Sequence, residues 1–270
     1  MANASAQLGI HRIVVILDAV EFGQSTLQTS VRLAAALGAK IEGVFVRDSN
    51  LSRLTGLPFL RELRPWSLAE DVFSEQRIES ELRALARNAE QFLAQAAAAL
   101  GVDWSFQVWQ GRIEAEVLIS HFEADLVTIH RSCFMRSYRL PPLPLAYRGA
   151  TRQAKATIDV LFDDSSQSAR ALAIACQLGR EWNTTVRLWL TAADDETMTR
   201  LQTQANTLLA AYQQPVRCIS LLNVGVRAFC QALNRSASSM LIAESGHPLL
   251  RQQGLSQCLK ELSCPVLLLR

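Results

Sequence analysis

The chain has 270 residues, of which 49% are hydrophobic and 19% are charged, with a formal net charge of +2. A chain of this length can fill one large core or two ordinary cores of roughly 140 residues each. The nearly balanced charge, with Arg and Lys spread through predicted helices, argues against a nucleic-acid surface, and no apolar run reaches the roughly 20 residues of a membrane span. We therefore expect a cytoplasmic protein without membrane insertion.

Strand and helix patterns alternate in the first half of the chain. The β-branched run from Arg12 to Leu17 is followed by Asp18, which is typical of a buried strand that ends in a loop. Two helical patterns end at Gly38 and Gly101, because glycine adopts the left-handed conformation that often follows a helix. In chain order we predict strands at 12–17, 41–46, 104–109 and 126–129, and helices at 27–37, 74–100 and 113–121.

The segment 48–74 is unusually long and apolar for a connection between two elements. Connections of this length tend to be lids or binding segments. One or two short helices, packed over the sheet end or against a dimer partner, would bury the apolar side chains. We predict that the segment binds a protein partner or a second copy of the chain, and the alternative is that it only covers the core. The residues chosen for this role are Leu57, Phe59, Leu60 and Trp66.

The second half repeats the alternation with shorter parts. We predict strands at 157–162, 185–190, 216–221, 240–243 and 266–269, and helices at 168–178, 196–212, 227–234 and 255–262. This order favours right-handed crossovers over a parallel sheet, in which ligands bind beyond the carboxyl ends of the strands. The run from Cys264 to Leu269 is apolar throughout except for Pro265, so the last strand should be buried on both faces.

The two halves also resemble each other directly. A shift of 114 positions aligns Gly111 with Gly225 and, without a gap, 124–129 with 238–243. A looser correspondence links the strand ends at Asp18 and Asp163. We therefore predict two tandem α/β domains, each with an open parallel sheet, packed as a pseudo-dimer about a pseudo-twofold axis. The predicted boundaries are 1–148 for the first domain, 149–156 for a linker and 157–270 for the second domain.

These motifs resemble those of the universal stress protein family in its tandem two-domain form. The resemblance rests on Phe162-Asp163-Asp164-Ser165, which is similar to a Val-Asp-Gly-Ser pattern, on the glycines after the third and fourth strands, and on the closing Cys264-Pro265-Val266-Leu267 strand. It covers nearly the whole chain. It implies a Rossmann-like fold, a broad role in stress responses and, in one branch of the family, ATP binding.

The nucleotide-binding loop of that branch has the form Gly-x2-Gly-x9-Gly-Ser/Thr, whose amides hold phosphates. The second half departs from it. Leu249 stands where the second glycine belongs, so its side chain should block the close approach of a phosphate, and Pro248 lacks an amide hydrogen. Ser256 is expected to cap the last helix. The first half has no glycine from Ser132 to Arg139. Its sequence does not decide whether residues 140–147 form a fifth strand of the first domain or belong to the linker. ATP, if bound at all, should therefore contact the second half, at Asp163, Leu190, Ser245, Gly246, Gly254 and Ser256.

Signatures of common catalytic and metal sites are missing from the sequence. The six cysteines form no Cys-x-x-Cys pair and no metal-like cluster with the four histidines, so most should be buried in a reducing compartment. The sequence has no HExxH motif, no Walker loop, no dinucleotide fingerprint and no Ser-Gly-Gly-x-Asp-Ser motif. We expect a non-enzymatic regulatory protein that works through protein partners. The alternative is an ATP-binding, slowly hydrolysing protein.

Overall fold

The computed structural model describes residues 8–18, 24–48, 61–63, 70–72, 75–111, 121–129, 156–212, 215–252 and 255–270. The first half contains β1 (Arg12–Asp18), α2 (Gln24–Leu37), β2 (Lys40–Asp48), β3 (Arg61–Leu63), β4 (Glu70–Val72), α4 (Glu75–Leu100), β5 (Trp104–Gly111) and β6 (Leu126–Ile129). The second half contains β7 (Thr157–Phe162), α6 (Ser166–Glu181), β8 (Thr185–Ala192), α7 (Asp195–Leu209), β9 (Val216–Leu222), α8 (Val226–Arg235), β10 (Met240–Glu244), α9 (Pro248–Gln252), α10 (Leu255–Glu261) and β11 (Val266–Leu269).

The alternating α/β pattern is confirmed. Gly38 and Gly101 follow α2 and α4 with φ angles of 61° and 64°, in the left-handed region that the sequence pattern predicted. Short helices were expected in the segment 48–74. Its described residues instead form β3 and β4, which pair as antiparallel strands. The proposed partner-binding residues Leu57, Phe59, Leu60 and Trp66 lie outside the described residues, as does most of the predicted helix 113–121.

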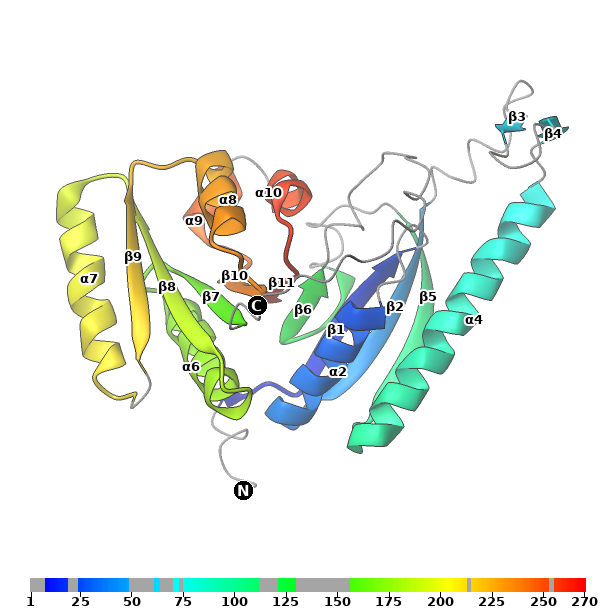
Figure 1. Cartoon of the computed structure of the whole chain (residues 1–270), viewed down its shortest axis with the longest axis horizontal. Coiled ribbons are helices and arrows are strands. Elements are labelled where there is room, and N and C mark those ends of the chain that lie inside the picture. Colours follow the sequence, from blue (N-terminus) through cyan, green and yellow to red (C-terminus); the bar gives the residue numbers. More distant parts are fainter. Residues whose placement is uncertain are drawn as a thin grey trace, which may run out of the picture.

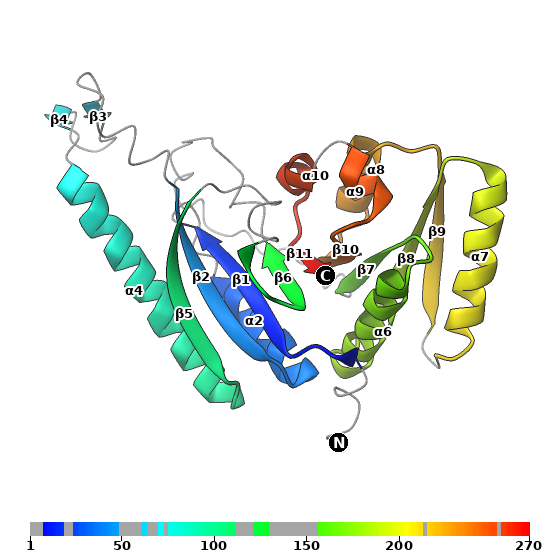
Figure 2. The same cartoon turned by 180° about the vertical axis from the view of Figure 1, so that it is seen from behind.

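The strands within each half pair in parallel, as predicted, but the two sets of strands join in one nine-stranded sheet and do not form two separate sheets. The strand order is β5-β2-β1-β6-β11-β10-β7-β8-β9, with the sheet running across the whole molecule in Figures 1 and 2. All neighbours are parallel except β6 and β11, which pair antiparallel from Val266 opposite Ile129 to Leu269 opposite Leu126. Every residue of these two strands is buried, so their pairing satisfies backbone groups that would otherwise lie unpaired in the core.

The junction joins strands that are not equivalent in the sequence repeat. The repeat aligns Leu126, at the start of β6, with Met240, at the start of β10, yet β6 pairs with β11. The pseudo-dimer with its pseudo-twofold axis therefore stays a prediction. The predicted domain boundary falls between residues 130 and 155, outside the described residues.

Two hydrophobic layers cover the two faces of the sheet, and each layer contains residues from both halves. Alternation along β7 places Val160 and Phe162 in the layer with α2, α4, α6 and α7, and places Leu161 in the layer with α8, α9 and α10. Because both layers continue across the β6–β11 junction, the halves share one core. The described cysteines Cys176, Cys230 and Cys264 are buried, as predicted for most, whereas Cys218 is exposed.

Each half of the sheet contains an ion pair with a buried carboxylate. Asp159 in β7 is completely buried and accepts two 2.7 Å hydrogen bonds from the guanidinium of Arg187 in β8, and the Trp189 indole also donates to it. In the first half, Glu42 in β2 accepts from Arg12 in β1, with 3.0 Å between Nε and Oε2. Such pairs fix the register of neighbouring strands, because an unpaired buried carboxylate is costly.

Polar contacts between the halves add to the shared core. The guanidinium of Arg170 in α6 donates to the carbonyls of Leu8 and Gly9, both at 2.6 Å, and so holds the segment that leads into β1. Gln177, also in α6, donates to the carbonyl of Ala36 in α2 at 3.0 Å. These contacts hold α6 and α2 side by side on one face of the sheet.

Candidate functional site

The candidate site lies at the carboxyl ends of β7 and β10, which are parallel neighbours in the sheet. β7 ends at Phe162 and leads through Asp163 to the start of α6, and β10 ends at Glu244 and leads through Gly246 to α9. Loops at this edge of a parallel sheet are where ligands bind in α/β proteins. The structure therefore brings together the predicted site residues Asp163, Ser245 and Gly246.

Ser165 organises the loop after β7. Its amide donates to Oδ1 of Asp163 at 3.1 Å, and its hydroxyl oxygen accepts from the Ser168 amide at 2.9 Å, which caps α6. Partial burial acts to raise the pKa of Asp163, but the hydrogen bonds from Ser165 and the proximity of His247 outweigh burial and hold this pKa below its ordinary value. Asp163 is therefore a carboxylate at neutral pH.

Glu244 brings a second carboxylate to the same place. The Ser165 hydroxyl donates to its Oε2 at 2.5 Å, so the end of β10 is tied to the start of α6. A helix N-terminus attracts anions because its first amides are unpaired and its dipole is positive there. In this chain a resident carboxylate lies beside the helix N-terminus, where a phosphate would otherwise be attracted.

The space beside Gly246 is filled by side chains of the protein. A Cβ atom added at Gly246 would lie 2.9 Å from Nη2 of Arg251 and 3.0 Å from Oε1 of Glu244. Both atoms are the far ends of flexible side chains, so a larger residue at 246 would displace the ends of Arg251 and Glu244 without moving the backbone. The sequence pattern did not identify Arg251, because nothing in its spacing shows that its side chain returns toward the glycine.

Most amides of the loop from 245 to 251 already donate to acceptors in the protein. Pro248 has no amide hydrogen. Of the other amides between 245 and 251, all of which the structure describes, only that of Gly246 has no acceptor in the protein. A phosphate-binding loop needs several free amides that point to one centre. The amides in use are those of Ser245, His247, Leu249, Leu250 and Arg251.

The side chain of Leu249 does not point into the candidate site as predicted. Its side chain was expected to block the approach of a phosphate, but it is 4% exposed and packs in the layer with α8 and α10. The obstacle at this position is therefore the amide, which donates to Nδ1 of His247 at 3.1 Å, and not the side chain. Because the Leu249 side chain is buried in that layer, replacing it with glycine would leave a cavity there.

Three other predicted site residues remain. Leu190 lies opposite Phe162, the last residue of β7, in the neighbouring strand. Leu190 is completely buried in β8 and packs in the layer with α6. Ser256 lies in α10 (Leu255–Glu261), and its expected role as the cap of this helix stays a prediction. Gly254 lies outside the described residues.

Asp164 adopts a backbone conformation that the sequence pattern did not reveal. Its φ angle is 72°, in the left-handed region that is costly for residues other than glycine, although Asp and Asn tolerate it better than most. The family pattern has glycine at this position. The loop after β7 therefore keeps the backbone shape of the pattern while it gains a further negative charge near Asp163 and Glu244.

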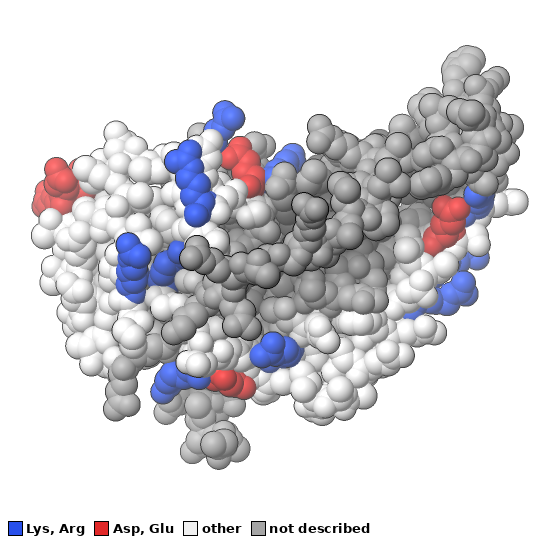
Figure 3. Space-filling model, viewed as in Figure 1, with Lys and Arg blue, Asp and Glu red and all other residues white. Residues whose placement is uncertain are grey.

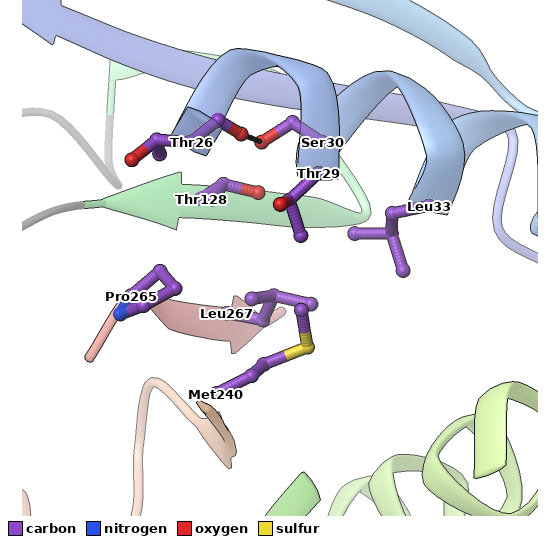
Figure 4. Close-up of a pocket in the computed structure, with 8 residues that line it drawn as sticks. All are labelled: Thr26, Thr29, Ser30, Leu33, Thr128, Met240, Pro265 and Leu267. Carbon is purple, nitrogen blue, oxygen red and sulfur yellow. Dashed lines mark hydrogen bonds between the residues drawn. The ribbon is translucent and has the colours of Figure 1, made fainter. Parts of the chain in front are cut away.

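A separate small pocket lies where α2 covers the β6–β11 junction (Figure 4). Its volume of about 10 Å³ is close to the minimum for one water molecule. Thr128 of β6 is 2% exposed, and its hydroxyl has no hydrogen-bond partner. The residues that line the pocket are Thr26, Thr29, Ser30, Leu33, Thr128, Met240, Pro265 and Leu267.

On the face in Figure 3, basic side chains lie in small scattered groups and form no continuous stripe. Within the described residues, no group of three or more His, Cys, Asp or Glu side chains is arranged to hold a metal ion. No helix among the described residues is both long and apolar enough to cross a membrane.

No family model and no curated protein matches the sequence. Among solved structures, the chain is similar to a universal stress protein from Archaeoglobus fulgidus DSM 4304, with 13% identity, a TM-score of 0.54, and coverage of 95% of this chain and 96% of that chain. It is also similar to a putative universal stress protein from Pseudomonas aeruginosa UCBPP-PA14, with 11% identity, a TM-score of 0.50, and coverage of 98% and 94%. At these identities the likeness shows that the chain has the universal stress protein fold.

Proposed function

We propose that this chain is a cytoplasmic, non-enzymatic regulatory protein of the universal stress type that acts through protein partners, with nucleotide binding weakened or lost. The observation that carries the proposal is the state of the loop from 245 to 251. All of its amides except that of Gly246 are used within the protein, and the side-chain ends of Glu244 and Arg251 lie in the space beside Gly246. In addition, the carboxylate of Glu244 lies beside Gly246 and repels phosphates, which offsets the attraction from the Arg251 guanidinium at the same glycine.

The size of the loss can be estimated from the contacts. Each missing phosphate contact costs on the order of 1 to 3 kcal/mol. Two or three such losses change a micromolar dissociation constant into a millimolar one, since each factor of ten corresponds to about 1.4 kcal/mol. ATP at this affinity would not be retained during purification.

The alternative proposal is an ATP-binding and slowly hydrolysing protein with its site in the second half. The convergence of Asp163, Ser165 and Gly246 at the carboxyl ends of β7 and β10 favours it. Native mass spectrometry of the purified full chain separates the two proposals. We expect the spectrum to show the mass of the chain, or of its protein assemblies, with no bound nucleotide. An adenine nucleotide bound in stoichiometric amount would support the alternative.

The partner-binding part of the proposal rests on the sequence of the segment 48–74, most of which lies outside the described residues. Its apolar side chains, Leu57, Phe59, Leu60 and Trp66, are more numerous than a solvated loop requires. Replacing Phe59 and Leu60 with Ser should weaken homodimer formation or the capture of a protein partner, while the core still melts cooperatively. If the wild type is monomeric and the double variant unfolds, the segment only covers the core.

A further inference from the structure

A buried histidine links the candidate site to the short helix that follows it. His247 is 1% exposed and lies between the end of β10 and α9. Its Nδ1 accepts from the Leu249 amide at 3.1 Å, and its carbonyl accepts from the amides of Leu250 at 2.9 Å and Arg251 at 3.1 Å. One residue therefore holds three consecutive amides of the turn 247–251.

The hydrogen bond at Nδ1 fixes the protonation state of the ring. A ring nitrogen that accepts carries no proton, so the neutral ring has its proton on Nε2. Nε2 meets no acceptor at ordinary hydrogen-bond geometry among the residues that the structure describes, although the Phe162 carbonyl lies near the ring. A second proton would have to go on Nδ1, which faces the Leu249 amide hydrogen, and two donors cannot face each other.

Charged groups on the surrounding segments act on this ring in opposite directions. Burial disfavours the charged ring and holds the pKa of His247 below its ordinary value, whereas Asp163 after β7 and the nearby Phe162 carbonyl favour the charged ring. Glu244 at the end of β10 and Arg251 in α9 carry the other charges on the same loop, and α6 has no acidic residue in its first turn. Protonation would thus exchange the Leu249 hydrogen bond for attraction to Asp163.

We propose that His247 is an acid-responsive switch, whose protonation at Nδ1 releases the Leu249 amide and opens the turn 247–251 beside the candidate site. The neutral ring stabilises the turn fully above about pH 6.5, the ordinary pKa of an unfolded histidine. That stabilisation is lost as the pH falls through the lower pKa of the folded state. The switch goes beyond the proposed function and does not depend on it, since it requires neither ATP nor a partner.

Hydrogen exchange on the full chain at pH 7.5 and pH 5.0, corrected for the intrinsic effect of pH, tests the switch. We expect protection of the amides of Leu249 to Arg251 to fall about fivefold in acid, as the loss of one capping bond predicts. Amides of β8, in the middle of the second half, serve as the internal control. In a His247→Asn variant the side-chain oxygen can accept from the Leu249 amide and does not titrate, so protection of the turn should not depend on pH.

A second variant keeps the proposal testable if His247→Asn fails to fold. Asp163→Asn removes the carboxylate that favours the charged ring, so the acid transition of the turn, followed by the NMR titration of His247, should move to lower pH. The proposal is overturned if the turn is equally protected at both pH values in the wild type. It is also overturned if His247→Asn shows the same loss in acid, or if Asp163→Asn leaves the transition unchanged.

Discussion

The hydroxyl of Ser165 donates to Oε2 of Glu244 at 2.5 Å and at the same time accepts from the Ser168 amide at the start of α6. This single side chain joins the carboxyl end of β10 to the helix that follows β7. As a result, the helix N-terminus that could attract a phosphate is already capped and has a carboxylate beside it. The chain keeps the universal stress protein fold while its own groups occupy the loops at the carboxyl ends of the strands.

Ser165→Ala should lower the free energy of unfolding by about 1 kcal/mol, because α6 loses its cap and Glu244 loses a donor. Urea denaturation of the full chain measures the change. Ser166→Ala is the matched control, since Ser166 is the exposed first residue of the same helix and should change stability little. Equal effects of the two variants would show that the link between Ser165 and Glu244 contributes nothing.

Arg187→Met should lower the free energy of unfolding by about 3 to 5 kcal/mol, because it leaves the carboxylate of Asp159 buried without its cation. The matched variant is Arg12→Met in the first half, which should cost about 1 kcal/mol or less, because the Arg12 side chain is 44% exposed and Glu42 keeps its hydrogen bond from Gln107. Comparable losses in the two variants, measured by urea denaturation at pH 7, would contradict this difference in burial.

Asp164→Gly should raise the free energy of unfolding by up to about 1 kcal/mol, because glycine adopts the positive φ angle without strain. Asp164→Val should lower it by about 1 to 2 kcal/mol, since a β-branched residue is strongly disfavoured in that region. Thermal unfolding of both variants and the wild type ranks their stabilities directly. If Asp164→Val is the more stable of the two, the residue does not adopt this conformation in solution.

Thr128→Val should raise the free energy of unfolding by about 1 to 2 kcal/mol, because it removes a buried hydroxyl without a partner and keeps the shape of the side chain. The matched control is Ser30→Ala, whose hydroxyl donates to the Thr26 carbonyl at 3.0 Å, so its removal gives no such gain. Urea denaturation compares them. A loss of stability in Thr128→Val would indicate that a water molecule in the pocket pairs with the hydroxyl.

The sequence predicted the order and kind of the described strands and helices other than β3, β4 and α9, because hydrophobic periodicity and glycine stops are local signals. It did not predict that β6 and β11 would join the halves into one sheet, because strand pairing between distant segments leaves no mark in either strand. Both strands are simply apolar, which indicates burial but not the neighbour. The antiparallel β3–β4 pair was missed for a related reason, since three-residue strands are too short to show alternation.

The candidate site was predictable in part. Asp163 and Gly246 lie at the predicted carboxyl edge because parallel sheets place strand ends together. The positions of the side chains around them were not predictable, since the approach of Arg251 to Gly246 and the use of the Leu249 amide by His247 depend on how the turn 247–251 folds. Leu249 illustrates the limit, because the departure from the glycine pattern was visible but its buried orientation was not.

Isothermal titration calorimetry of the full chain with ATP and magnesium tests the central claim most directly. We expect no measurable heat or a millimolar dissociation constant, since the loop from 245 to 251 has few amides free for a phosphate. A micromolar dissociation constant that is lost in Gly246→Val or Asp163→Ala would contradict the account, and would establish the second half as a nucleotide-binding site.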